Sequence, residues 1–384
     1  MPDASSSEDA NPSVPSEAVG RSPSGGSASL SKIGLSLGLS LAVLLVIGYF
    51  TFDTSTFWKL VRAMQPWPFI AALVLAISRT FFGGWRLHFV SRGRLTLMEG
   101  TRGQLAIDFF SNITPSAIGG SPLATLYIAK DRGIRVGEAT AFMLFSALLD
   151  QLWFAFSISV VLATSTVVDV IPPSIGDVGL WAFVAVFVGM LAWATLFAYA
   201  TLFRPSLLER LASRIFSFRY LSRFHDRVME EMHAFTQRAH ALRTQPPAFY
   251  LKGFVLTSGV WIGRFALVVF IIWSVFPTFD KLLVFLRTIA MTMSSLVLPT
   301  PGGSGGLEGL YALFIGPLIP EALVAPTLLA WRVLGYYIFL ALGAYLFLHQ
   351  IQRIRASSND GDAASSPNGQ PSAASPSVPS SSTE

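Results

Sequence analysis

The segment from Pro299 to Gly309 constrains the fold most strongly, because it interrupts a stretch that is otherwise apolar enough for a membrane. It reads Pro-Thr-Pro-Gly-Gly-Ser-Gly-Gly-Leu-Glu-Gly, and prolines and glycines at this density prevent a continuous helix. At membrane depth, broken backbone is tolerated only where protein or a water-filled cavity covers it. Glu308, an acid beside the break, is therefore a candidate for a functional site. The alternative is a short loop between two spans, with Glu308 at the lipid–water interface.

Composition places the chain among all-α polytopic membrane proteins. Hydrophobic residues make up 52% of the sequence and charged residues 13%, and the mean hydropathy is +0.56. The sequence contains no cysteine, which excludes disulfides and thiolate chemistry, and its five histidines show no metal-ligand spacing. We therefore expect no metal and no cofactor. We also expect no nucleic-acid partner, because no basic soluble domain is evident.

Six apolar runs are long enough to span a bilayer. They cover about residues 33–52, 66–90, 138–164, 179–203, 250–276 and 321–349. Residues 1–30 and 356–384 contain almost no large apolar side chains, so we expect two disordered tails around an integral membrane domain at 31–355.

The charges of the loops predict the orientation of the spans. Basic residues predominate in the loops 91–104, 130–138 and 204–252, and at the start of the C-terminal tail, whereas the loop 166–178 carries only acids. Basic loops stay in the cytoplasm. We therefore expect a multi-pass protein of the cell membrane with both termini in the cytoplasm.

Two further apolar segments are broken and cannot cross the membrane as single helices. The segment 104–129 is interrupted at 114–122 and is flanked by two cytoplasmic loops, which predicts a re-entrant hairpin that enters from the cytoplasm. The pair 281–298 and 306–320 follows an external loop and precedes the last span, which predicts a second hairpin that enters from outside. The expected fold is six spans and two oppositely directed hairpins.

The two hairpins belong to an internal repeat. Pro115, Gly119, Leu123, Leu126 and Tyr127 have the same mutual spacing as Pro299, Gly303, Leu307, Leu310 and Tyr311. The helix before each hairpin carries an arginine, Arg79 or Arg264. The repeat units, 66–165 and 251–349, are predicted to have opposite orientations, as in many membrane carriers.

Residues 204–248 connect the two units and are too polar to span. Apolar residues recur at helical spacing and arginines fill the other faces. One interpretation is an amphipathic helix on the inner leaflet, with arginines at lipid phosphates. The other is a helix that packs on the cytoplasmic face of its own protein.

The glycine breaks offer a place for an anionic headgroup, because the first amides of a half-helix are unpaired and carry positive charge. The alternative is that these glycines only allow close helix packing. The predicted substrate-binding residues lie at the two breaks and include Asn112, Thr114, Pro115, Gly119, Gly120, Tyr127, Pro299, Pro301, Gly302, Gly303, Gly305 and Glu308.

Ionisable residues inside the apolar runs require partners, since each costs about 2.5–3.5 kcal/mol at a helix centre. Arg79, Asp150, Glu308 and Arg332 lie deep in their runs, and Arg264 is the repeat-related counterpart of Arg79. We expect these five residues to pair across the repeat interface or to contact a substrate. Arg86, Arg287 and Asp108 lie nearer the ends of their runs, where the side chains can reach the interface.

These features resemble the transmembrane region of the lysylphosphatidylglycerol synthases, a flippase-like membrane family. The resemblance covers most of residues 35–350. It rests on the segment Asn112 to Gly120, Tyr127, the basic loop with Gly133, the helix that carries Asp150, the segment Leu298 to Glu308, and Arg332. It implies a phospholipid or lipid-linked substrate that moves between leaflets, and some members carry an added aminoacyl-transfer domain.

The sequence departs from those larger members after its last span, where residues 350–384 are polar. We therefore expect no lysyl-transferring activity and predict that the chain is not an enzyme. A small-solute or ion carrier would suit the same architecture, and so would a scaffold for a separate lipid-modifying enzyme. A homo-oligomer is compatible with all three functions.

Overall fold

The computed structural model describes residues 62, 64–113, 120–199, 204, 210, 213–214, 225–295, 305–349 and 352. Five helices in this part are long and apolar enough to cross a membrane: α3 (Pro66–Val90), α6 (Val136–Thr164), α7 (Gly176–Ala198), α10 (Pro247–Val275) and α13 (Glu321–Arg332, which continues to His349). The described residues form no strand. The predicted all-α polytopic fold is thus confirmed, and the sixth expected span, at 33–52, lies outside the described residues.

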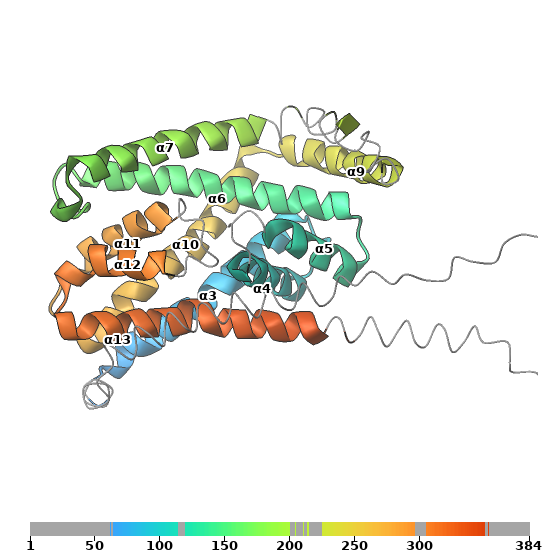
Figure 1. The fold of residues 1–384 in the computed structure, drawn as a ribbon. Helices are drawn as coiled ribbons and strands as arrows, with labels where there is room; N and C mark the ends of the chain where they lie inside the picture. The colour runs from blue at the N-terminus through green and yellow to red at the C-terminus, as the bar shows by residue number, and fades with distance from the viewer. Residues whose placement is uncertain are drawn as a thin grey trace, which may run out of the picture.

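Large apolar side chains cover the outside of the bundle. Ile77 on α3, Trp181 on α7 and Leu282 are each at least 65% exposed. A soluble protein rarely exposes so continuous an apolar surface, whereas lipid tails favour it. Helix α7 lies at the edge of the bundle beside α6 (Figure 1). Only 11% of its apolar stretch Gly179–Leu196 is buried.

The four shorter helices form the two expected hairpins. Helices α4 (Leu97–Ile113) and α5 (Gly120–Arg132) form the first, and α11 (Lys281–Ser295) and α12 (Gly306–Phe314) form the second. At 1.5 Å per residue, none of the four is long enough for a hydrocarbon core of about 30 Å. Figure 1 shows α4–α5 near one end of the bundle and α11–α12 near the other. The oppositely directed hairpins are confirmed, and their tips, 114–119 and 296–304, lie outside the described residues.

Helix α4 begins at Leu97, earlier than the expected start at Gln104. Thr96 and Glu99 form a reciprocal cap: the Thr96 amide donates to Glu99 Oε2 over 2.7 Å, and the Glu99 amide donates to Thr96 Oγ1 over 3.4 Å. Arg132, the last residue of α5, forms an ion pair with Glu99 over 2.7 Å. Part of the expected cytoplasmic loop 91–104 is thus helical. The Glu99 carboxylate links the start of α4 to the end of α5.

Glycines bring α3 and α4 close together. A Cβ atom added at Gly100 would overlap the carbonyl oxygen of Gly84, and one added at Gly84 would overlap Thr101. Small residues at membrane helix contacts allow this approach. Helix α3 also packs along α10 through the centre of the bundle, so the first helices of the two repeats lie side by side.

Helix α9 (His225–Arg243) lies on α6, at the end of the bundle that carries the first hairpin (Figure 1). The Gly137 amide donates to Glu231 Oε2 over 2.6 Å, and Arg238 donates to the Ser91 carbonyl over 2.8 Å. Phe235 and Ala239 are buried against Ala141 of α6. For residues 225–243, packing on the protein itself is therefore the interpretation that holds. Binding of 204–224 to a membrane surface stays a prediction.

Candidate functional site

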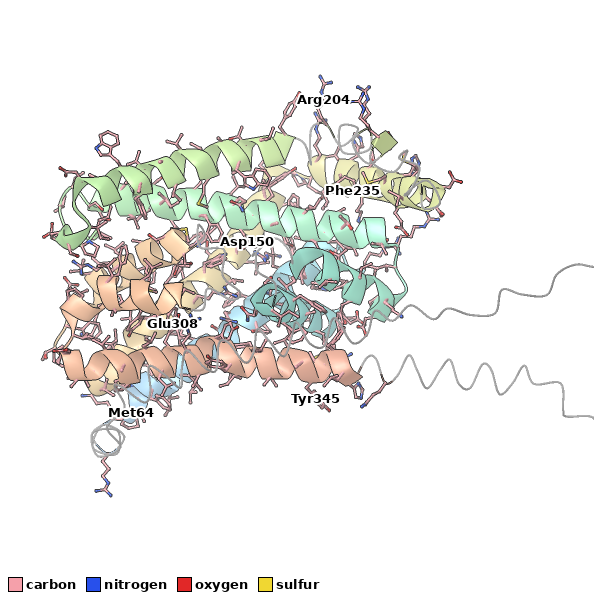
Figure 2. All side chains as sticks on the ribbon, in the orientation of Figure 1. Met64, Asp150, Arg204, Phe235, Glu308 and Tyr345 are labelled. Carbon is pink, nitrogen blue, oxygen red and sulfur yellow. The ribbon has the colours of Figure 1, made fainter. Side chains whose placement is uncertain are left out.

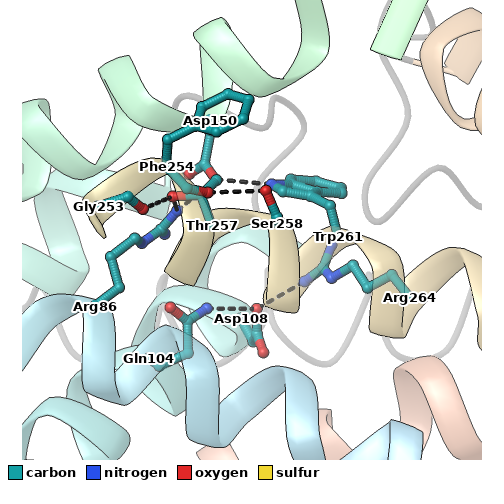
Figure 3. A network of polar contacts seen from close by, with 10 residues as sticks. All are labelled: Arg86, Gln104, Asp108, Asp150, Gly253, Phe254, Thr257, Ser258, Trp261 and Arg264. Carbon is teal, nitrogen blue, oxygen red and sulfur yellow. Dashed lines mark hydrogen bonds and ion pairs between the residues drawn. The ribbon is translucent and has the colours of Figure 1, made fainter. Parts of the chain in front are cut away.

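The carboxylate of Asp108 on α4 joins the two repeats in the interior of the bundle. Arg79 Nη2 on α3 lies 3.1 Å from Asp108 Oδ2, and Arg264 Nη2 on α10 lies 2.9 Å from Oδ1. Gln104, one turn earlier on α4, donates its amide to Oδ1 over 3.2 Å. Figure 3 shows Gln104 and Arg264 on either side of this carboxylate. The two repeat-related arginines thus converge on a single acid.

Arg79 is fixed on several sides. Its Nη1 donates to the carbonyl oxygen of Gly335 over 2.9 Å, and its guanidinium carbon lies 4.0 Å from the centre of the Phe339 ring. Gly335 belongs to a π-helical turn, Val333–Tyr337, inside the last span. Such turns shift the backbone hydrogen bonds and often mark functional sites. In this protein the π-helical turn directs the Gly335 carbonyl oxygen towards the buried Arg79.

Arg264 is held less tightly than Arg79. Among the described residues its side chain makes one hydrogen bond, to Asp108, and its buried Nε has no partner. Its guanidinium lies over the ring of Trp261, with 4.9 Å between the guanidinium carbon and the ring centre. The Arg264 side chain is 32% exposed, against 6% for Arg79 and 4% for Asp108.

A second charge pair, between α3 and α6, contacts residues of α10 close to Arg264. Arg86 Nη1 on α3 is 2.5 Å from Asp150 Oδ1 on α6, and Arg86 also donates to Thr257 over 3.3 Å. The Trp261 indole nitrogen donates to the same Asp150 oxygen over 2.8 Å. Trp261 therefore lies between the two clusters, with its N–H towards Asp150 and its ring face towards Arg264 (Figure 3).

A third pair fastens the second hairpin to the last span. Arg332 Nη2 on α13 lies 2.6 Å from Glu308 Oε1 on α12, and both side chains are about 95% buried. Glu308 stands in the first turn of α12, where the helix dipole favours an acid. Its other oxygen, Oε2, is buried and has no hydrogen-bond partner among the described residues. Figure 2 places Glu308 and Asp150 in the middle of the bundle.

The sequence is similar to those of known membrane proteins. The family model described as "Lysylphosphatidylglycerol synthase TM region" matches residues 35–343. The chain belongs to this family. A UPF0104 membrane protein of Archaeoglobus fulgidus is 22% identical over 315 residues, which cover 80% of this chain and 93% of that protein.

In this family member, five predicted intramembrane charges, Arg79, Asp150, Arg264, Glu308 and Arg332, all lie in ion pairs. The prediction that Asp108 and Arg86 reach the interface is wrong. Both are buried, because Asp108 on α4 contacts α3 and α10 and Arg86 contacts α6 and α10. Gln104 was missed, although its spacing of four residues from Asp108 in an apolar helix is a usable signal.

Arg287 lies towards the start of its helix, as expected, beside the α6–α7 connection. It is buried, and it donates to the Asp169 carbonyl over 2.8 Å and to the Phe314 carbonyl over 3.0 Å. The Asp169 carbonyl belongs to the α6–α7 connection, and the Phe314 carbonyl ends α12. Arg287 thus satisfies backbone oxygens where the second hairpin meets that connection.

The predicted binding residues at the breaks are only partly described. Tyr127 is buried among Leu87, Phe110 and Ile128, which is a packing environment. Gly305 precedes α12 with φ at +82°, a conformation that favours glycine. Asn112 is half-buried near the end of α4, and Gly120 begins α5. The remaining break residues, Thr114, Pro115, Gly119, Pro299, Pro301, Gly302 and Gly303, lie outside the described residues. Substrate binding by this set stays a prediction.

Proposed function

We propose that this protein binds a phospholipid or a lipid-linked substrate between its two hairpins and moves it from one leaflet to the other. The observation that carries the proposal is that charged residues from both repeats meet in the bundle interior, around Asp108 and Trp261. Intramembrane charges of this kind mark substrate pathways. Membership of the family is consistent with a role in membrane lipid chemistry.

The opposed hairpins give the proposal a geometry. Each enters the bundle from a different end, so a headgroup between their tips would be reachable from either side if the hairpins rock in turn. We propose a transport protein without catalytic activity. We also propose that the end with α9 faces the cytoplasm, since it carries the basic loops.

Reconstitution into vesicles tests the proposal. Vesicles are prepared with a phospholipid probe that carries a fluorophore in both leaflets, and dithionite then destroys the fluorophores that reach the outer leaflet. We expect the full chain to move the inner-leaflet probe to the outer leaflet, where dithionite destroys its fluorescence, whether or not a pH gradient is applied. Vesicles without protein should keep the fluorescence of their inner leaflet. If vesicles with folded protein keep the inner-leaflet fluorescence of both an anionic and a zwitterionic probe, translocation is refuted. Uptake of a solute in the same vesicles would favour a carrier.

A further inference from the structure

The three charge clusters in the bundle interior do not carry the same net charge. Arg86 balances Asp150, and Arg332 balances Glu308. Around Asp108, two arginines face one carboxylate, so this cluster carries one excess positive charge. An unbalanced charge in an apolar interior is costly, which favours an anion at this place.

The two arginines at Asp108 differ in how freely they can bind something else. Arg79 is buried and is held by Asp108, the Gly335 carbonyl and the Phe339 ring. Arg264 is one-third exposed and contributes a single N–H to Asp108 among the described residues. A guanidinium has five N–H donors, so most of those on Arg264 stay available. The excess charge is therefore accessible at Arg264.

Paired N–H groups of a guanidinium match two oxygens of a phosphate. Trp261 supports the guanidinium from one face and so limits its orientation. We propose that Arg264 binds the phosphate of a membrane lipid and releases Asp108 when it does so. The inference rests on the proposed lipid translocation, and it names the side chain that takes the lipid phosphate and the acid that this side chain leaves.

The exchange leaves no carboxylate unpaired. When Arg264 turns towards a phosphate, Asp108 keeps its ion pair with Arg79 and the amide of Gln104. The excess charge of the cluster is then neutralised by the substrate. Asp108 thus competes with the substrate for Arg264, and this competition gives the proposal a distinctive test.

Binding can be measured apart from transport. The full chain in a neutral detergent is titrated with phosphatidylglycerol, diacylglycerol or inorganic phosphate, and bound lipid is counted by native mass spectrometry. We expect phosphatidylglycerol to bind about tenfold or more tightly than diacylglycerol, as one charge-assisted hydrogen bond would give. Equal binding of the two lipids would overturn the proposal. If inorganic phosphate binds more tightly than phosphatidylglycerol, the site takes free phosphate and not the phosphate of a lipid, and the proposal is overturned.

Three variants locate the site. Arg264→Gln should weaken phosphatidylglycerol binding about tenfold, whereas Arg102→Gln, which removes the same charge from an exposed position on α4, should leave it unchanged. Asp108→Asn removes the competitor and should tighten binding.

Arg264→Lys keeps the charge but loses the paired donors, so it gives a result even if Arg264→Gln does not fold. We expect it to weaken binding by about threefold or more. Unchanged affinity in both Arg264 variants, or weaker binding in folded Asp108→Asn, would overturn the assignment. Loss of translocation with binding retained would instead refute only the proposed function.

Discussion

The carbonyl oxygen of Gly335 accepts a hydrogen bond from Nη1 of Arg79 over 2.9 Å, and this bond joins the last span of one repeat to the first helix of the other. Three residues earlier on α13, Arg332 holds Glu308 on the second hairpin. Arg79 in turn holds Asp108 on the first hairpin. The π-helical turn and Arg332, the residue just before it, are thus connected to both hairpins through ion pairs and hydrogen bonds, which gives a contiguous physical link between them.

Glu308→Gln should lower stability and abolish translocation. Removing one partner of a buried ion pair costs about 3–5 kcal/mol, because the remaining charge stays buried alone. We expect the variant to insert and stay helical, with a lower Tm. Adding Arg332→Gln should recover much of the Tm but not the translocation.

Glu321→Gln is the matched control for that change, since Glu321 also lies in the first turn of a helix but is exposed. It should alter neither Tm nor translocation. Full translocation by Glu308→Gln would remove this residue from the site.

Cysteines placed singly at Arg102 and Lys130 should react with an impermeant thiol reagent from the same side of the membrane. Both positions are exposed and lie on the hairpin that begins and ends at one end of the bundle. The sequence has no cysteine of its own, so no background labelling arises. A cysteine at Val167, in the α6–α7 connection at the other end, should react from the opposite side. Labelling of Arg102 and Lys130 positions from different sides would contradict the re-entrant hairpin.

Gly137→Ala should loosen α9 from α6. A methyl group at this position would overlap the carbonyl oxygen of Glu231, and both elements present backbone there, so neither can yield easily. We expect faster cleavage by trypsin at the basic residues of α9 in limited proteolysis. Gly189→Ala on α7, where a methyl group meets nothing, should be cleaved like the wild type. Equal cleavage of the two variants would argue against the close contact.

Glu99 should make the first hairpin sensitive to acid. Burial alone would raise the pKa of Glu99, but the hydrogen bonds from Thr96 and the charges of Arg132 and Arg102 outweigh it and lower the pKa. A lowered pKa in the folded state means that the stabilisation is fully present above the ordinary value of 4.5. It is lost as the pH falls through the folded-state value.

Hydrogen exchange at the start of α4 measures this effect. Protection of these amides should be constant above about pH 5 and fall at lower pH in the wild type, after correction for intrinsic exchange rates. Glu99→Gln should show weaker protection that no longer depends on pH over this range. A wild-type profile identical to that of Glu99→Gln would rule out the proposed cap.

The sequence by itself determined the membrane class, the spans in the described part and the two hairpins. Apolar length is a local property, because about 20 residues must cross the hydrocarbon and the backbone must satisfy itself within each helix. Proline and glycine clusters mark breaks for the same local reason. The arginine that precedes each break, Arg79 or Arg264, was likewise visible in the repeat.

Only the tertiary structure decided which charges meet. Arg79 and Arg264 are far apart in sequence, and their convergence on Asp108 depends on how α3, α4 and α10 are rotated about their axes. The role of Gly335 depends on a π-helical turn that no residue pattern announced. Asp108 and Arg86 were misplaced because position within an apolar run measures depth along one helix. Whether a side chain on that helix is buried depends instead on the neighbouring helices that pack around it.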